Sequence, residues 1–341
     1  MSGQDTRQAW VDVAKGASIL LVVVYHATLY LRIEGQAAYA FVQLNTLLEP
    51  VRMPLFFCLS GFLAAGMLQR GWGDLFRRRI LLFAYLFALW SILRFYFYRY
   101  GIENTLTPSE GADHAELLSG WLVPSSGLWF IWALALYALI AKALYPWAAP
   151  ALAVLVVLSA ATFGQIVAVE SFAHHNVLAY APYFMAGAWY GRPAVAFLAQ
   201  RPCALLLVSG VLFAGLLAAV SQLDGAAYGA ARAGLSAAAL VGASAVALFA
   251  ARWSPAERTL SYFGRNTLPI YVAHTPIVSL LAALLAAQAA DLPLLRYWGV
   301  PLTVIVATAA ALALHSVAER AGLRFLYALP QAVTARMPKR A

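Results

Sequence analysis

Two side chains near the start of the chain could act together in proton transfer and anion binding. Lys15 and His26 are eleven residues apart in a mostly apolar stretch. In an α-helix, eleven residues make three turns plus about 20°, so both side chains lie on one face, about 16 Å apart along the axis. Histidine can act as a general base, and lysine can hold an anionic group as a point charge. The structural alternatives are a lysine that pairs with Asp12 and a histidine that hydrogen-bonds a neighbouring helix.

A second group of polar side chains follows in the next apolar run. Asn45, Glu49 and Arg52 have the spacing i, i+4, i+7 and therefore share one helix face. Glu49 and Arg52 can form a structural ion pair that removes most of the cost of burying them. Alternatively, Glu49 orients the imidazole of His26 and raises its basicity. The sequence leaves both interpretations open.

The composition is typical of a protein that crosses a membrane many times. Of the 341 residues, 63% are hydrophobic and only 11% are charged. A soluble domain averages about 45–50% apolar and about 25% charged residues, and disordered chains are poor in aromatics, so both classes are excluded. The net charge of +9 does not indicate nucleic-acid binding, because membrane proteins concentrate Lys and Arg in cytoplasmic loops. The two cysteines form neither a disulfide framework nor a metal site.

Apolar runs between charge clusters and Gly or Pro breaks predict an all-α, polytopic transmembrane helical bundle of about ten spans. The second run contains Pro50 and Pro54, which predict a broken or strongly kinked helix. The first run is expected to be a retained span rather than a signal peptide, because no small-residue cleavage site closes it. The predicted spans are 16–31, 41–68, 80–98, 128–145, 151–169, 177–190, 204–220, 231–251, 267–290 and 300–317.

The distribution of basic residues predicts that both termini are cytoplasmic. With this orientation, most of the 23 Lys and Arg residues fall in cytoplasmic segments. The loop 101–127 contains Glu110 and other acidic residues but no Lys or Arg, and it is long enough to cover a site on the outer face. We expect a single integral-membrane domain over 1–341, with short cytoplasmic tails at 1–11 and 320–341.

Polar residues inside the later spans need either a partner or a function, because burying them in a bilayer is costly. Arg94 lies deep in the third span and is expected to be paired, whereas Arg99 is expected to snorkel among interfacial tyrosines. His274 lies about two turns into the ninth span and, taken alone, is expected to be a packing histidine. The pair Ser60-Gly61 in the second span allows another backbone to approach closely.

Several of these stretches together resemble the acyltransferase 3 family of membrane O-acyltransferases. Asp12-Val-Ala-Lys15-Gly16, followed by Tyr25-His26, is similar to the family's first-helix motif, in which a basic residue precedes the histidine by eleven positions. Residues 54–62, Pro-Leu-Phe-Phe-Cys-Leu-Ser-Gly-Phe, resemble its second-helix signature. The other matching residues, in the family's order, are Arg77, Arg78, Arg79, Tyr85, Leu128, Trp129, Phe130, Tyr183, Phe184, Gly187, Asn266, Tyr271 and His274.

The chain departs from the family pattern at three positions. Many members have Arg where this chain has Lys15, although Lys resembles the branch that acts on polysaccharide sugars such as fucose. The family's usual proline is replaced by Ala84, and its usual serine by Thr267. Lysine lacks the bidentate fork of arginine, so donor binding is expected to differ in detail.

The resemblance implies an acyltransferase of the bacterial inner membrane. Its donor would be cytoplasmic acyl-CoA, usually acetyl-CoA, used as a co-substrate with no permanently bound cofactor. Its acceptor would be a sugar hydroxyl on the outer side, which is a poor nucleophile and needs a base. O-antigen, capsule, exopolysaccharide, periplasmic glucan and a non-sugar acceptor all remain open, as does the oligomeric state.

The resemblance also suggests a set of site residues. The catalytic residues would be His26, as a general base or transient acyl carrier, and Glu49. Either Glu49 or Asp12 would support the charge balance. Arg52, Ser60 and Asn266 would shape the pocket or stabilise an oxyanion. The residues assigned to donor or acceptor binding are Lys15, Asp12, Arg52, Ser60, Tyr85, Arg94, Trp129, Asn266, Tyr271 and His274. No metal site is expected.

Two other functions are compatible with the same residues. A proton-coupled transporter or flippase could use His26, Glu49 and Arg52 as a relay. The absence of a visible internal repeat disfavours this reading, because inverted-repeat transporters show matching broken helices in both halves. The third hypothesis is a membrane sensor that keeps the fold but catalyses no reaction. In every case the surrounding partner is the lipid bilayer, and no nucleic acid is expected.

Overall fold

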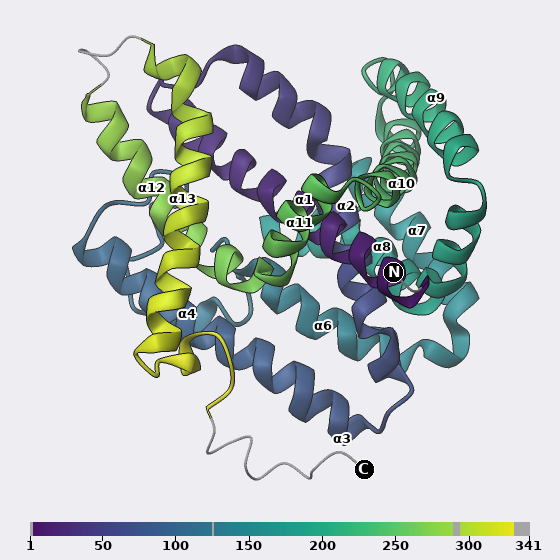
Figure 1. Cartoon of the computed structure of the whole chain (residues 1–341), viewed down its shortest axis with the longest axis horizontal. Coiled ribbons are helices and arrows are strands. Elements are labelled where there is room, and N and C mark those ends of the chain that lie inside the picture. Colours follow the sequence, from purple (N-terminus) through teal and green to yellow (C-terminus); the bar gives the residue numbers. More distant parts are fainter. Residues whose placement is uncertain (1–2, 125, 289–293, 331–341) are drawn as a thin grey trace. The chain divides into compact units, whose positions relative to one another are not determined.

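A computed structural model describes residues 3–124, 126–288 and 294–330, and the elements within these ranges are helices (Figure 1). The end of the ninth predicted span, 289–290, and most of the predicted C-terminal tail, 331–341, lie outside the described residues. The contacts within the chain divide it into two units, and three helices contribute residues to both. These shared helices are α1 (Gly3–Ile33), α2 (Tyr39–Leu68) and α6 (Trp129–Ala143).

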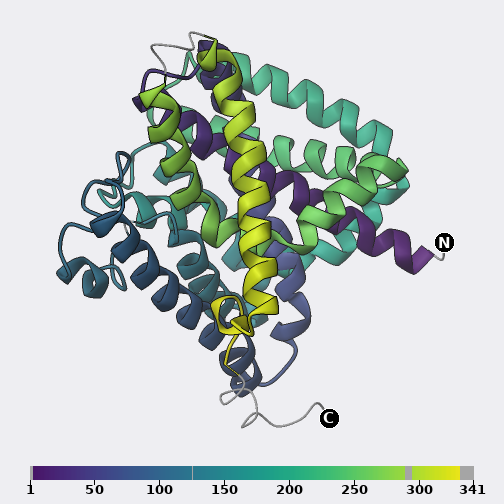
Figure 2. The same ribbon diagram turned by 60° about the vertical axis from the view of Figure 1, so that its left-hand side comes forward.

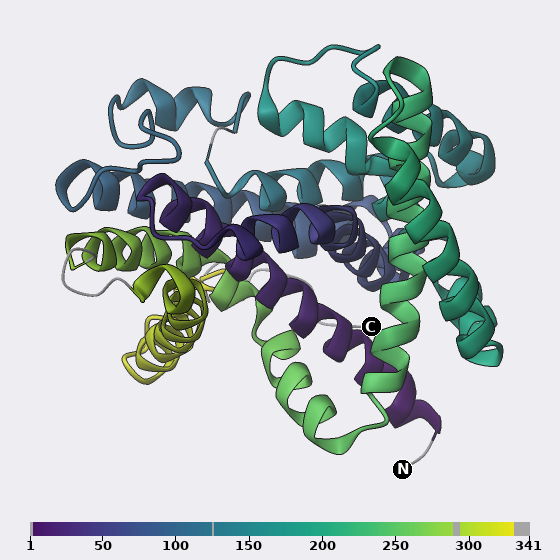
Figure 3. The same ribbon diagram turned by 90° about the horizontal axis from the view of Figure 1, so that it is seen from above.

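The first unit comprises 1–19, 47–70 and 136–265. Besides its parts of the shared helices, it contains η2 (Tyr145–Trp147), α7 (Ala148–Phe163), α8 (Phe172–Gln200), α9 (Pro202–Val220), α10 (Gly225–Ala250) and α11 (Ser254–Arg265). α9 and α10 lie side by side as an antiparallel pair (Figure 3). Because these helices are rich in Ala, Leu and Val and satisfy their backbone groups internally, they suit a lipid environment.

Small residues allow the helices of the first unit to pack closely. A Cβ atom at Gly61 of α2 would collide with the carbonyl oxygen of Phe184 on α8 and would lie 2.9 Å from the nitrogen of Ala188. Reciprocally, a Cβ atom at Gly187 of α8 would collide with the carbonyl oxygen of Cys58. The close backbone approach expected at Ser60-Gly61 is thus confirmed.

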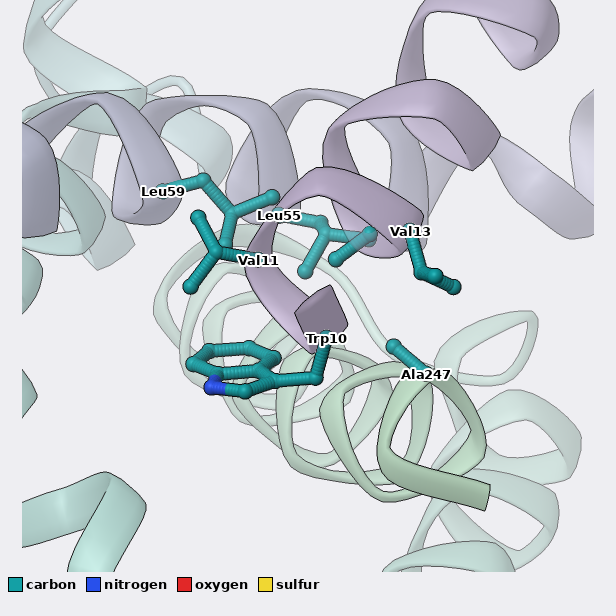
Figure 4. Packing of buried hydrophobic residues seen from close by; sticks show 7 residues of the cluster. Trp10, Val11, Val13, Leu55, Leu59 and Ala247 are labelled. Carbon is teal, nitrogen blue, oxygen red and sulfur yellow. The ribbon is translucent and has the colours of Figure 1, made fainter. Parts of the chain in front are cut away.

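The N-terminal part of α1 packs into an apolar cluster of the first unit. Its side chains meet residues of α2 and α10 (Figure 4). The members of the cluster are Trp10, Val11, Val13, Ala14, Leu55, Leu59 and Ala247. This cluster fixes the stretch of α1 that leads directly to Lys15.

The second unit comprises 20–46, 71–135 and 266–341. Its described part contains α3 (Trp72–Leu75), the π-helical turn η1 (Phe76–Ile80), α4 (Leu81–Tyr100), α5 (Ala115–Ser119), α12 (Thr267–Ala287), α13 (Leu295–Arg320) and η3 (Arg324–Leu326). α12 and α13 lie against each other (Figure 2). The C-terminal half of α1, which carries His26, belongs to this unit.

The predicted fold class is confirmed. Eight helical stretches in the described part of the chain are long and apolar enough to cross a membrane, and α6 is a shorter apolar helix. α8, with 29 residues, covers the sixth predicted span, so about ten spans agree with the structure. The side of the membrane on which the termini lie stays a prediction.

Two local features differ from the sequence prediction. α2 runs as one continuous helix through Pro50 and Pro54, so the helix is not broken there, and the alternative of a strong kink stays a prediction. Each proline removes only one backbone donor, and packed neighbouring helices allow a transmembrane helix to tolerate this loss. α11 was not predicted, because its twelve residues are amphipathic and too short to appear as an apolar span.

Candidate active site

The centre of the candidate site is a pair of histidines in the second unit. His26 of α1 and His274 of α12 are 248 positions apart in the sequence, yet His26 Nδ1 and His274 Nε2 are 3.1 Å apart. The ring centroids are 4.9 Å apart and the ring planes are inclined by 64°, an edge-to-face arrangement. Two imidazoles within hydrogen-bonding distance can hold or share a proton. The structure thus joins two histidines that the sequence interpretation had treated separately.

Backbone groups and one hydroxyl fix the orientation of this pair. His26 Nδ1 lies 3.0 Å from the carbonyl oxygen of Val22, one turn earlier on α1. His274 Nδ1 lies 2.7 Å from the carbonyl oxygen of Tyr271 and 3.1 Å from that of Ile270. The hydroxyl of Thr275 is 3.2 Å from His274 Nε2. His274 is only 1% exposed, whereas His26 is partly exposed, so His26 is the more accessible of the two rings.

A buried ion pair lies in the same unit. Arg94 donates two hydrogen bonds to Glu110, from Nε at 2.8 Å and from Nη2 at 2.9 Å. Asn104 also donates to this carboxylate, and the hydroxyl of Tyr30 donates to the Asn104 side chain at 2.7 Å. The expectation that Arg94 is paired is confirmed, and its partner comes from the acidic loop. These bonds fasten that loop to α4 and to α1.

The backbone at Gly127 links the arginine network to the histidine pair. A Cβ atom at Gly127 would lie 3.3 Å from Arg94 Nη1 and 3.5 Å from the hydroxyl of Thr275. Tyr271 donates a hydrogen bond of 2.6 Å from its hydroxyl to the carbonyl oxygen of Gly127. Arg94, Tyr271 and His274, all predicted site residues, therefore belong to one connected region of the second unit, together with Thr275.

A cleft of about 490 Å³ opens beside this region. Its polar lining includes Arg99, Glu103, Asn104 and Glu110, with Tyr98 and Tyr100 beside them. Aromatic faces next to hydrogen-bonding side chains are typical of sites for small polar ligands. A smaller pocket shares Glu110 with the cleft and is also lined by Glu116. Partial burial raises the pKa of the Glu116 carboxyl above its ordinary value.

The predicted donor-binding residues Lys15 and Asp12 form an ion pair in the first unit. Lys15 Nζ lies 3.2 Å from Asp12 Oδ1. Helix α11 packs directly on this turn, since a Cβ atom at Gly264 would lie 2.9 Å from the Cα atom of Asp12. The packing holds the backbone around Lys15, while its side chain remains partly exposed at 18%. Lys15 can therefore still meet an anionic ligand.

The structure pairs Glu49 with a residue that the sequence interpretation missed. Arg232 of α10 donates a hydrogen bond of 2.9 Å from Nη2 to Glu49 Oε1 and one of 2.7 Å from Nη1 to Ser236. The signal for Arg232 was present, since an arginine inside a predicted span needs a partner. Arg52 is buried on α2 at 4% exposure. A role for Glu49 in orienting His26 stays a prediction.

The remaining predicted site residues lie in several places. Tyr85 of α4 donates a hydrogen bond of 2.9 Å to the carbonyl oxygen of Phe325, and so helps to hold the C-terminal segment of the second unit. Ser60 donates to the carbonyl oxygen of Phe56 within α2. Trp129 is buried at the start of α6, and Asn266 directly precedes α12. Their binding roles stay predictions.

Within the described ranges, no group of three His, Cys, Asp or Glu side chains could hold a metal ion. The chemistry that these residues can supply rests on the two imidazoles and the Arg94–Glu110 pair of the second unit, and on the ion pairs of the first unit. The histidine pair can accept a proton, the Lys15 region can attract an anion, and the cleft lined by Arg99 and Asn104 can hold a polar molecule.

Comparison with known proteins adds independent information. A family model described as an acyltransferase domain matches residues 8–318. The inner membrane protein YcfT of Escherichia coli (strain K12) is 26% identical over 215 residues, which cover 58% of this chain and 60% of that protein. The match thus spans less than two thirds of the relative's length. No solved structure matches the chain significantly.

Proposed function

The chain belongs to the acyltransferase 3 family, and from this premise we propose that it is an inner-membrane O-acyltransferase. It moves an acyl group, with acetyl the first candidate, from cytoplasmic acyl-CoA to a hydroxyl of a cell-envelope or exported glycan. The observation that carries this proposal is the close pair formed by His26 and His274. A partly exposed imidazole held by a buried one suits a general base.

The proposed reaction uses His26 as the base. His26 takes the proton of the acceptor hydroxyl while that oxygen bonds to the carbonyl carbon of the thioester. The carbon–sulfur bond then breaks, and the proton passes from His26 to the departing thiolate of CoA. Proton transfer of this kind typically accelerates a reaction about 10²–10⁴-fold.

The proposed donor and acceptor sites rest on charge and shape. Lys15, partly exposed beside Asp12, would attract a phosphate of the CoA moiety. The cleft lined by Tyr98, Arg99, Tyr100 and Asn104 would admit a polyhydroxylated acceptor, because its lining offers both ring faces and hydrogen-bonding groups.

The decisive experiment compares envelope glycans from a deletion strain complemented with the wild-type chain or with variants. Mass spectrometry should show acetylated glycan with the wild type and with His315→Ala, a control that also removes one histidine. His26→Ala should lose the acetyl increment although the protein reaches the membrane in normal amount. Undiminished acetylation with His26→Ala would overturn the assignment of the base.

Lys15→Ala tests the donor site separately. It should raise the KM for acetyl-CoA with a smaller effect on kcat, and unchanged affinity for acetyl-CoA would remove Lys15 from the site. If proteoliposomes that contain the purified protein accumulate a glycan without any acyl donor, this result would favour a transporter or flippase over an acyltransferase.

A further inference from the structure

The hydrogen bonds of the histidine pair determine which nitrogen of each ring carries a proton. A carbonyl oxygen can only accept a hydrogen bond, so an imidazole nitrogen bonded to it must be the donor. His274 Nδ1 is 2.7 Å from the carbonyl oxygen of Tyr271, and it therefore carries the proton. In the neutral ring, His274 Nε2 then bears a lone pair and acts as an acceptor.

The same reasoning applies to His26. Its Nδ1 lies 3.0 Å from the carbonyl oxygen of Val22 and 3.1 Å from His274 Nε2. Both of these neighbours are acceptors, so the proton on His26 belongs at Nδ1 and is shared between them. The basic lone pair of His26 is consequently on Nε2, at the ring position remote from Nδ1.

We propose that His274 is a positioning residue that accepts the Nδ1 hydrogen of His26 and so fixes Nε2 of His26 as the base. This inference rests on the proposed function, since it specifies how the same site works. When Nε2 takes the acceptor's proton, Nδ1 keeps its hydrogen, and the lone pair of His274 faces the new positive charge. His274 thus does for His26 what an orienting carboxylate does in a catalytic triad, without burying a second charge.

The burial and packing of His274 support a positioning role rather than direct contact with substrate. Its side chain is 1% exposed, and both of its ring nitrogens have neighbours within hydrogen-bonding distance. The tautomer of His274 is itself fixed by the α12 backbone. The Tyr271 hydroxyl, bonded to Gly127, ties the same turn of α12 to the neighbouring loop.

The first arm of the test measures the proton position without any enzymatic assay. The full chain is labelled with ¹⁵N at histidine Nδ1 only, reconstituted in bilayers and observed by solid-state NMR at a pH where histidine is neutral. The difference between the wild-type and His26→Ala spectra isolates the His26 signal. We expect a protonated, pyrrole-type Nδ1, and a bare, pyridine-type Nδ1 would overturn the proposal.

The second arm uses paired substitutions. His274→Leu keeps an apolar volume but removes the acceptor, whereas a glutamine side chain in His274→Gln can present an amide oxygen near the position of Nε2. In a serine-protease triad, loss of the carboxylate that orients the histidine lowers kcat about 10⁴-fold. Because the carbonyl of Val22 still holds the His26 hydrogen, we expect a smaller loss, about 10–100-fold in kcat, for His274→Leu and a partial recovery for His274→Gln.

The assay measures transfer of radiolabelled acetyl from acetyl-CoA to glycan in membranes from the deletion strain that expresses the wild-type chain or a variant, with His315→Ala as the control. The KM for acetyl-CoA should stay unchanged in both His274 variants, which separates positioning from a folding defect. Full activity of His274→Leu, or equal losses in the leucine and glutamine variants, would refute the positioning role. If the wild type itself transfers no acetyl, the proposed function fails, while the NMR arm still decides the tautomer.

Discussion

The ion pair between Arg94 and Glu110 leads to a quantitative prediction about the stability of the protein. Glu110→Ala removes the carboxylate that accepts two hydrogen bonds of 2.8 and 2.9 Å from Arg94. The arginine side chain is only 2% exposed, so water cannot replace the lost partner without a rearrangement. The variant therefore leaves a guanidinium charge buried without its counter-charge.

The expected cost follows from the burial of both partners. Breaking a buried pair by removing one member costs about 3–5 kcal/mol, since the remaining charge is uncompensated. With about 2 °C per kcal/mol for a chain of at least 150 residues, the melting temperature should fall by roughly 6–10 °C. Glu110→Gln keeps one acceptor oxygen but turns an amide donor towards the arginine, so about half of this loss is expected.

Thermal unfolding of the purified protein in detergent, followed by tryptophan fluorescence, measures these shifts. The double variant Arg94→Leu/Glu110→Leu is the matched control, because apolar replacement of a whole buried pair is often neutral. It should melt within a few degrees of the wild type. The reasoning fails if Glu110→Ala has the same melting temperature as the wild type, or if the melting temperature of the double variant is as low as that of Glu110→Ala.

Three further substitutions test other parts of the structure. Gly61→Ala should destabilise the first unit by about 1–3 kcal/mol, because its methyl group would meet the Phe184 carbonyl; the melting temperature of the purified variant checks this. Lys142→Met removes the ammonium that donates to the carbonyl oxygens of Leu68, at 2.9 Å, and Arg70, so the end of α2 should become more accessible to limited proteolysis. Tyr327→Phe should be neutral or slightly stabilising, because this variant loses only a buried hydroxyl that has no hydrogen-bond partner in the described part of the chain. Burial raises the pKa of Tyr327 to about 12, above the ordinary 10, so between these values the unfolded chain releases this proton first. Stability should therefore fall as the pH rises from 10 to 12, and a comparison of melting curves should show a smaller fall in Tyr327→Phe.

The fold could be predicted because its signal is local. Each span is a run of apolar residues long enough to cross a bilayer, and such a run is visible without knowing its neighbours. The prediction failed where the local pattern was ambiguous. Prolines 50 and 54 left a break and a kink of α2 both open, and the structure has one continuous helix there. The amphipathic α11 was missed because only one of its faces is apolar.

The candidate site could be predicted only in part, for a related reason. Helix periodicity shows which residues share a face, and it anticipated the contact between Asp12 and Lys15. It does not show which face of another helix lies opposite. The partner of Glu49 is 183 positions away, and that of His26 is 248 positions away, so neither Arg232 nor His274 could be identified as a partner by spacing.

The cost of charge inside a membrane explains why a histidine, rather than a carboxylate, suits the position beside His26. Glu49 and Glu110 each face an arginine, which offsets the cost of holding an ionised group near the spans. A carboxylate at the position of His274 would need such a partner as well, in a place that is 1% exposed. A neutral imidazole that donates its Nδ1 hydrogen to a carbonyl oxygen of the α12 backbone bears a lone pair on Nε2. It offers this lone pair at the same place and carries no charge. As a hydrogen-bond acceptor for His26, a neutral imidazole orients the ring less strongly than a carboxylate would, but it avoids the desolvation penalty of a buried charge. In the proposed reaction, only the imidazolium of His26 would then add charge to the site.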